Sequence, residues 1–247
     1  MNVKVMSYNI QAGKNDEDIE ERSFDFSLDV IKSVGADIIG LNEVGRHAHG
    51  DRFPKLELGC EPYEYLGRRL GLNFSFAEAI FTHDGCPYGN ALLTRYKILS
   101  TERIFIPDPP RTEDKYYETR CILKAELDVA GGVTVLVTHF GTVESERVSA
   151  VEALLSLVPK IKTPVILMGD FNLTPDDPVL KPLYEILKDT NCGRSTPYSW
   201  PSNKAIHEEE SRKIDYIFTS ENISVLNFKV VETKASDHLP VIAEIEL

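Results

Sequence analysis

Three short polar segments, each following an apolar strand-like run, are the strongest constraint on how this chain can fold. They are residues 41–43 (Leu-Asn-Glu), 169–172 (Gly-Asp-Phe-Asn) and 236–238 (Ser-Asp-His). A β-strand is a rigid mount, so side chains just beyond strand ends can be held in fixed positions. A carboxylate, an amide and an imidazole placed in this way are the groups that a metal-assisted phosphate-ester hydrolase needs. The sequence therefore indicates a reaction type more clearly than a substrate.

Eleven segments have the composition or the alternation of β-strands. Residues 164–170 are almost continuously apolar, as in a central strand, whereas residues 121–129 alternate and lead through the Gly131-Gly132 turn into a hairpin partner. The expected strands are residues 3–9, 37–43, 74–81, 90–94, 98–106, 121–129, 133–140, 164–170, 214–219, 225–231 and 241–247.

Four segments are expected to be helical: residues 17–34, 56–70, 142–157 and 178–188. The segment 142–157 has the clearest periodicity. Its apolar face is expected to consist of Val143, Val148, Val151, Leu154, Leu155 and Val158. Strands interleaved with a few helices, without a flexible linker, predict two sheets packed face to face with helices outside. One domain over residues 1–247 is the expected organisation, although two small domains would also fit this length.

The composition and charge of the chain limit the kinds of molecule that it is expected to bind. The chain is 42% hydrophobic and 27% charged, as is usual for a soluble globular protein, and its net charge of -12 weakens the case for strong nucleic-acid binding. No apolar run approaches the roughly 20 residues that span a bilayer. The beginning lacks the features of a signal peptide, so a cytoplasmic location is expected for a bacterial source. The four cysteines form no C-x-x-C pair, which argues against a zinc cage.

Two of the polar strand ends suggest metal and water handling. Glu43 ends an apolar strand, where a carboxylate is costly unless it meets a cation or a donor; a salt-bridged Glu is the alternative. Asn9 ends the first strand in the same way, but alone it would more often be a turn residue. Asp170 and Asn172 are two residues apart in the sequence, so their side chains would face the same side of an extended segment. The carboxylate could orient a water, and the amide could donate to a phosphoryl oxygen. A turn cap is an equally good explanation of that pair.

Imidazoles follow other strands. His238, next to Asp237, can donate to phosphate or move protons, and Asp215 could hold its ring in place. His139 closes the strand 133–140 and is a second candidate acid or phosphate donor. Taken alone, Asp215 is as often a buried capped residue, and a strand-end His is more often merely hydrogen-bonded. His47 and His49, soon after Glu43, could rim the site or face solvent.

The ordered set of motifs resembles the endonuclease/exonuclease/phosphatase superfamily over essentially the whole chain. The motifs that carry the resemblance are residues 7–9 (Ser-Tyr-Asn), 41–43, 89–95 (Gly-Asn-Ala-Leu-Leu-Thr-Arg), 138–140 (Thr-His-Phe), 169–172, 213–217 (Lys-Ile-Asp-Tyr-Ile) and 236–240 (Ser-Asp-His-Leu-Pro). Each motif alone is weak evidence, and their order makes the set specific. The resemblance implies a four-layer α/β sandwich, with two mixed sheets flanked by helices, and Mg²⁺- or Mn²⁺-dependent cleavage of phosphate esters.

The same resemblance implies a role for each matching position. Glu43 is the expected principal metal ligand, with Asn9 and Asp237 beside the metal. Among the implied catalytic residues, Asp170 aligns or deprotonates water and Asn172 is a transition-state donor. His238 contacts phosphate and is supported by Asp215. His139 is similar to the second histidine of the deoxyribonuclease and sphingomyelinase branches. Asn90 and Arg120 are the expected substrate-binding residues. For Arg120 this expectation rests on the favourable geometry of arginine–phosphate pairs, and an exposed salt bridge is the commoner role. Trp200 could offer a stacking surface, although a packed loop anchor is the commoner role.

Three functions stay open at this point. The favoured one is hydrolysis of a phosphodiester of a small molecule or lipid headgroup. A DNA or RNA nuclease would require scattered basic residues to gather on one face; these are Arg68, Arg69, Arg95, Lys97, Arg111 and Lys115. A non-catalytic binding module on the same scaffold is the third possibility. The sequence does not fix the oligomeric state or the number of metal ions.

Overall fold

A computed structural model describes residues 1–16, 22–47, 56–112, 116–192, 197–204 and 210–247. These residues form two six-stranded sheets. In spatial order, the first sheet consists of β11 (Ser224–Val230), β12 (Val241–Glu246), β1 (Asn2–Asn9), β2 (Ile38–Val44), β4 (Pro87–Thr94) and β3 (Asn73–Phe81). The second consists of β5 (Ile98–Phe105), β6 (Cys121–Leu127), β7 (Val133–His139), β8 (Val165–Asp170), β10 (Asp215–Thr219) and β9 (Lys188–Asp189). All eleven expected strands are confirmed, and β9 is an addition.

Each sheet is mixed and is built around one central parallel pair. β1 runs parallel to β2 and β7 runs parallel to β8, while the other pairings are antiparallel. Parallel partners end at the same edge of a sheet, so the residues that close β1 and β2 lie together, as do those that close β7 and β8. This edge carries the polar strand ends.

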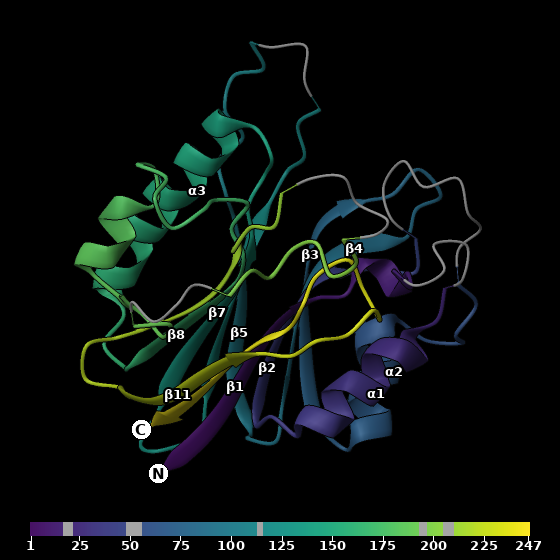
Figure 1. The fold of residues 1–247 in the computed structure, drawn as a ribbon, viewed down its shortest axis with the longest axis horizontal. Helices are drawn as coiled ribbons and strands as arrows, with labels where there is room; N and C mark the ends of the chain where they lie inside the picture. The colour runs from purple at the N-terminus through teal and green to yellow at the C-terminus, as the bar shows by residue number, and fades with distance from the viewer. Residues whose placement is uncertain (17–21, 48–55, 113–115, 193–196, 205–209) are drawn as a thin grey trace.

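The two sheets and the helices outside them form four layers (Figure 1), and three apolar clusters lie between these layers. The first lies between the sheets and includes Val5 of β1 and Met168 of β8. The second joins the second sheet to α3 (Glu144–Leu157), for example through Leu154 and Leu167. The third joins the first sheet to α1 (Phe24–Val34) and α2 (Pro62–Leu70). Since β8 is covered on both faces, its continuous apolar sequence has a direct explanation. The predicted four-layer sandwich is confirmed.

The helices are shorter than expected. Of the segment 17–34, residues 17–21 lie outside the described residues, and α1 begins after Ser23, whose side chain accepts a hydrogen bond from the Asp25 N–H at 3.1 Å. α1 ends at Gly35, which has a left-handed conformation. In α3, Val151 and Leu154 are buried as expected, but Val148 is 36% exposed. The expected apolar face of this helix was therefore too wide.

The prediction of an α-helix over residues 178–188 was wrong. Only a 3₁₀ turn, η3 (Lys181–Glu185), forms there, and β9 begins at Lys188. Pro182 lies inside that turn and lacks the N–H that an α-helix would need, which explains the shorter element. The remaining 3₁₀ turns among the described residues are η1 (Gln11–Gly13) and η2 (Val158–Lys160).

The helices of the described residues are all too short or too polar to cross a membrane. The expected cytoplasmic location stays a prediction.

Gly169 should be essential for stability because it lies directly against the backbone of Thr138 in the neighbouring strand β7. Its φ is +148°, and a Cβ placed on it would lie 1.8 Å from the carbonyl oxygen of Thr138. Gly169→Ala is expected to lower the free energy of unfolding by about 4 kcal/mol or more, whereas Gly35→Ala, with φ +60° and open space around it, should cost about 1 kcal/mol. Urea unfolding measures both, and equal losses would contradict this packing argument.

Candidate active site

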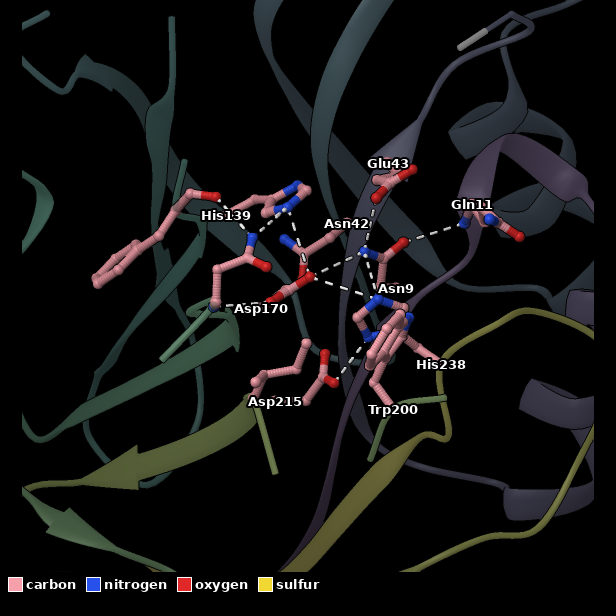
Figure 2. Close-up of polar contacts among 12 residues, drawn as sticks. Asn9, Gln11, Asn42, Glu43, His139, Asp170, Trp200, Asp215 and His238 are labelled. Atoms are coloured by element: carbon pink, nitrogen blue, oxygen red, sulfur yellow. Dashed lines mark hydrogen bonds and ion pairs between the residues drawn. The ribbon is translucent and has the colours of Figure 1, made fainter. Parts of the chain in front are cut away.

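The ends of the central strands of both sheets meet at one place (Figure 2). Asn9 of β1 pairs with Asn42 of β2, and His139 of β7 pairs with Asp170 of β8. Asp215 begins β10 on the other side of Asp170. Strand register thus brings together groups that are far apart in sequence.

Asn42 joins the two sheets at this place. Its Nδ2 donates to Asn90 Oδ1 at 2.7 Å and to the Thr138 carbonyl at 2.8 Å, and its Oδ1 accepts from the Asp170 N–H at 3.0 Å. The side chain is fully buried, so these bonds replace water that the amide cannot reach. Asn42 therefore fixes the end of β8 relative to β2.

Asp170 is the central carboxylate of the cluster. Its Oδ1 accepts from the Asn172 N–H at 2.9 Å and its Oδ2 from Asn9 Nδ2 at 3.1 Å, while the Nε2 atoms of His139 and His238 lie 3.5 and 3.6 Å from Oδ2. Burial raises the pKa of Asp170 to about 7, although the charge of His238 opposes this shift. A carboxylate with a pKa near neutrality is suited to general base catalysis.

His238 forms a pair with Asp215. The two are joined by a bond of 2.8 Å between His238 Nδ1 and Asp215 Oδ2, which leaves Nε2 facing Asp170. Burial disfavours the charged imidazole, but the carboxylates of Asp215, Asp170 and Asp237 outweigh it and raise the pKa of His238 well above 6.5. His238 is therefore a cation at neutral pH, with an Nε2–H available to donate.

His139 has the opposite character. The guanidinium of Arg120 donates to His139 Nδ1 at 2.9 Å, so Nδ1 must keep its lone pair and the proton lies on Nε2. Burial and the positive charges of Arg120 and His238 lower the pKa of His139 well below 6.5. Two imidazoles with pKa values shifted in opposite directions thus lie beside the same oxygen of Asp170.

Glu43 stands at the end of β2 with both carboxylate oxygens bonded. Oε1 accepts from Asn9 Nδ2 at 2.9 Å, and Oε2 accepts from the Tyr88 hydroxyl at 2.7 Å. Glu43 and Asn172 have φ values of +55° and +49°. These left-handed conformations cost energy in non-glycine residues and are concentrated at functional sites.

Carboxylates near Glu43 fit a hard divalent cation. The pKa of Asp237 is raised by burial and by the negative charges of Glu43 and Asp16, despite the nearby charge of His238. A cation would relieve this repulsion, and carboxylate oxygens are the ligands that Mg²⁺ and Mn²⁺ prefer. Asn9 turns its amide nitrogen toward Glu43 while its Oδ1 accepts from the Gln11 N–H at 3.1 Å. In this orientation Asn9 supports Glu43, and its predicted metal contact stays a prediction.

A different carboxylate–imidazole set is also close enough to hold an ion. Asp170, Asp215 and His238 bring one donor atom each within 4.8 Å of one another. However, all three are buried, and Asp215 Oδ2 is already bonded to His238 Nδ1. Glu43 instead lines the cavity and is partly exposed, so its surroundings fit a hydrated divalent cation better.

The cavity has a volume of about 410 Å³. Predicted site residues on its wall are Glu43, Arg120, His139, Asp170, Asn172 and His238. Trp200 and Arg212 also line it, with the guanidinium of Arg212 4.6 Å from the centre of the Trp200 ring. Further lining residues are Thr142, Arg147 and Ile214.

Some predicted residues lie beside the cavity. Asp237 accepts from Trp200 Nε1–H at 3.4 Å, and Asp215 lies beneath His238. Asn90 bonds Asn42 and the Cys121 carbonyl, at 2.9 Å, so its amide links the two sheets and its predicted substrate contact stays a prediction. His47 lies outside the cavity wall, and His49 lies outside the described residues.

Three residues of the site were not predicted from the sequence: Asn42, Tyr88 and Arg147. Asn42 was part of a recognised motif, and its place before Glu43 was the available signal. Tyr88 depends on the register between β2 and β4, and Arg147 depends on how the first turn of α3 meets the cavity. Neither relationship has a local sequence pattern.

The profile of the Endonuclease/Exonuclease/phosphatase family matches residues 6–238, and the chain belongs to this family. Members of the family are phosphoester hydrolases and are in general dependent on divalent metal ions. A comparison with curated proteins found no match.

Solved structures share the fold. An endonuclease/exonuclease/phosphatase from Beutenbergia cavernae is 24% identical with a TM-score of 0.77, and the match covers 100% of this chain and 72% of that one. A mannosyl-6-phosphatase from Bacteroides thetaiotaomicron is 18% identical with a TM-score of 0.73, covering 99% and 100%. TDP2 from D. rerio, complexed with a single-strand DNA product, is 16% identical with a TM-score of 0.72, covering 100% and 99%.

Removal of the Asn42 amide should loosen the contact between the sheets. Asn42→Ala leaves the Asp170 N–H and the Thr138 carbonyl buried without their partner, at a cost of roughly 1–3 kcal/mol each, so a total loss of about 2–6 kcal/mol is expected. Asn73→Ala is the matched control, because that exposed amide donates to the carbonyls of Arg95 and Tyr96 at the surface. Urea unfolding that gives both variants the same small loss would contradict this role.

The neutral state of His139 can be observed directly. We expect ¹⁵N NMR at neutral pH to show the Nε2–H tautomer, with a pKa below 6.5. Arg120→Met removes a positive charge, which favours protonation, and should therefore raise the pKa of His139. Arg103→Met, which removes an exposed arginine paired with Glu78, should leave that pKa unchanged. A pKa of His139 at or above 6.5 in the wild type, or a pKa that does not change in Arg120→Met, would contradict the assignment.

Proposed function

We propose that this protein hydrolyses a phosphate ester with the help of Mg²⁺ or Mn²⁺, most directly a phosphodiester of a small molecule or lipid headgroup. The observation that carries the proposal is the position of Asp170, a buried carboxylate with a pKa of about 7 between two imidazoles and next to a cavity. Because the site takes residues from both sheets, we also propose that residues 1–247 act as one domain.

Each side chain of the site has a separate role in the proposed reaction. Asp170 aligns the attacking water and accepts its proton. The cationic His238, held by Asp215, donates its Nε2–H to a phosphoryl oxygen, and the neutral His139 donates in the same way from the other side. Asn172 holds its Nδ2 3.4 Å from His139 Nε2, and is a further donor to the transition state. A divalent cation at Glu43, when bound, would neutralise phosphate charge.

Two arginines favour an anionic substrate in the cavity. The Nε atoms of Arg120 and Arg147 are buried and have no hydrogen-bond partner among the described residues, although both side chains line the cavity. A buried guanidinium donor without a partner is costly, and phosphate oxygens match its geometry. We infer that Arg120 and Arg147 contact the phosphate group or a second anionic group of the substrate.

The size of the cavity and the position of Arg95 favour a small substrate over a nucleic acid. A volume of about 410 Å³ is typical of small-molecule sites. Arg95, one of the basic residues that a nuclease would need nearby, pairs with Asp37 at 2.7 Å, at the beginning of β2 and therefore at the opposite edge of the sheet from Glu43. Lys115, another of them, lies outside the described residues.

Hydrolysis of bis-para-nitrophenyl phosphate and para-nitrophenyl phosphate tests the proposal. We expect activity on the diester with Mg²⁺ or Mn²⁺, its loss in EDTA, and a decrease of at least about 100-fold in Asp170→Asn and His238→Ala. Asp128→Asn, an exposed carboxylate at the far end of β6, is the matched control and should keep full activity. Activity on the monoester alone would indicate a phosphatase. Activity that survives EDTA or Asp170→Asn would reject the proposed site.

A further inference from the structure

A second cluster of metal-binding side chains lies away from the active-site cavity. His47 follows the end of β2, and His83 and Asp84 belong to the turn between β3 and β4. One nitrogen or oxygen from each residue lies within 4.8 Å of the other two. The three residues are absent from the described wall of the active-site cavity. Two segments far apart in the sequence therefore bring together two imidazoles and a carboxylate.

His47 is an unusual buried residue. It is 3% exposed, both ring nitrogens are inaccessible to solvent, and neither has a hydrogen-bond partner in the described part of the chain. Nδ1 lies 3.4 Å from Asp84 Oδ1, close enough for electrostatic attraction but without the alignment of a hydrogen bond. Burial of polar nitrogens without a partner is unfavourable, and a metal bond to one of them would offset that cost.

The spacing of the cluster suits a metal ion. With metal–ligand bonds of ~2.1 Å, two ligand atoms of a tetrahedral site are roughly 3.4 Å apart. His47 Nδ1 and Asp84 Oδ1 have this separation. The rings of His47 and His83 are 4.8 Å apart, centre to centre, at an angle of 64°, so the rings are not stacked in parallel. The side chain of Asp84 is 26% exposed, which gives an ion a route from solvent.

We propose that His47, His83 and Asp84 form a second metal site that binds Zn²⁺ or a similar transition-metal ion. Two imidazoles and one carboxylate are ligands that Zn²⁺ accepts readily, whereas Mg²⁺ prefers oxygen alone. The thiol of Cys86 lies 3.6 Å from Asp84 Oδ2 and places a further soft donor close to the cluster. This proposal does not depend on the proposed hydrolysis.

An ion at this place would link the loop after β2 to the β3–β4 turn. The same two segments lead to Glu43 and Tyr88, which are bonded to each other at 2.7 Å. Gly45, in the loop after β2, packs closely against Tyr88, since a Cβ on it would lie 2.6 Å from the Tyr88 ring. Zn²⁺ would therefore stabilise the part of the fold that supports Glu43, and it should raise the unfolding temperature because it binds only the folded chain.

Zn²⁺ binding to chelator-treated protein without a polyhistidine tag tests the site. We expect mass spectrometry of bound metal, in excess Mg²⁺, to find one Zn²⁺ per chain that His83→Ala and Asp84→Asn lose. Zn²⁺ should raise the unfolding temperature of the wild type and of Asp128→Asn, a matched change of an exposed carboxylate, but not of Asp84→Asn. Co²⁺ in place of Zn²⁺ should give a visible absorption band that both ligand variants lose.

Glu43→Ala separates this site from the catalytic one. It should keep the bound Zn²⁺ and the Co²⁺ band, because Glu43 is not a ligand of the second site. Failure of the wild type to bind Zn²⁺ would overturn the proposal, as would binding that persists in His83→Ala and Asp84→Asn. Loss of the ion in Glu43→Ala alone would place it in the catalytic centre and would overturn the proposal as well.

Discussion

The burial of one carboxylate where the two sheets meet is the constraint on which the site depends. Asp170 lies at the end of a strand that is covered on both faces, so its charge cannot be solvated by bulk water. Side-chain amides of the first sheet take the place of water around Asp170. Asn42 accepts a hydrogen bond from the Asp170 N–H, and Asn9 donates to the Asp170 carboxylate. The same contacts that hold the sheets in register therefore also position the proposed base.

Electrostatics explains why two histidines at one site can have different charges. His238 faces carboxylates, and their attraction exceeds the cost of its burial, so it is held as a cation. His139 receives a hydrogen bond from Arg120 and lies near the positive charge of His238, so it is held neutral. A charged and a neutral donor flanking one base is an arrangement suited to an anionic transition state.

The sequence predicted the fold better than it predicted the contacts within the site. Strands such as β6 and β8 were found because alternation and continuous burial leave a local pattern, and the motif residues Asp170 and His238 could be placed at strand ends. The contact of Asn42 with β7 and β8 depends on the register between two sheets, which has no local pattern. Similarly, Pro182 weakened a helical pattern in a way that periodicity did not detect.

A crystal structure with Mn²⁺ and inorganic phosphate would test the account most directly, because the anomalous signal of Mn²⁺ locates the ion independently of activity. We predict Mn²⁺ beside Glu43, with phosphate in the cavity contacting Asn172 and the Nε2 atoms of His139 and His238. Mn²⁺ bound instead between Asp170, Asp215 and His238, or phosphate outside the cavity, would contradict it.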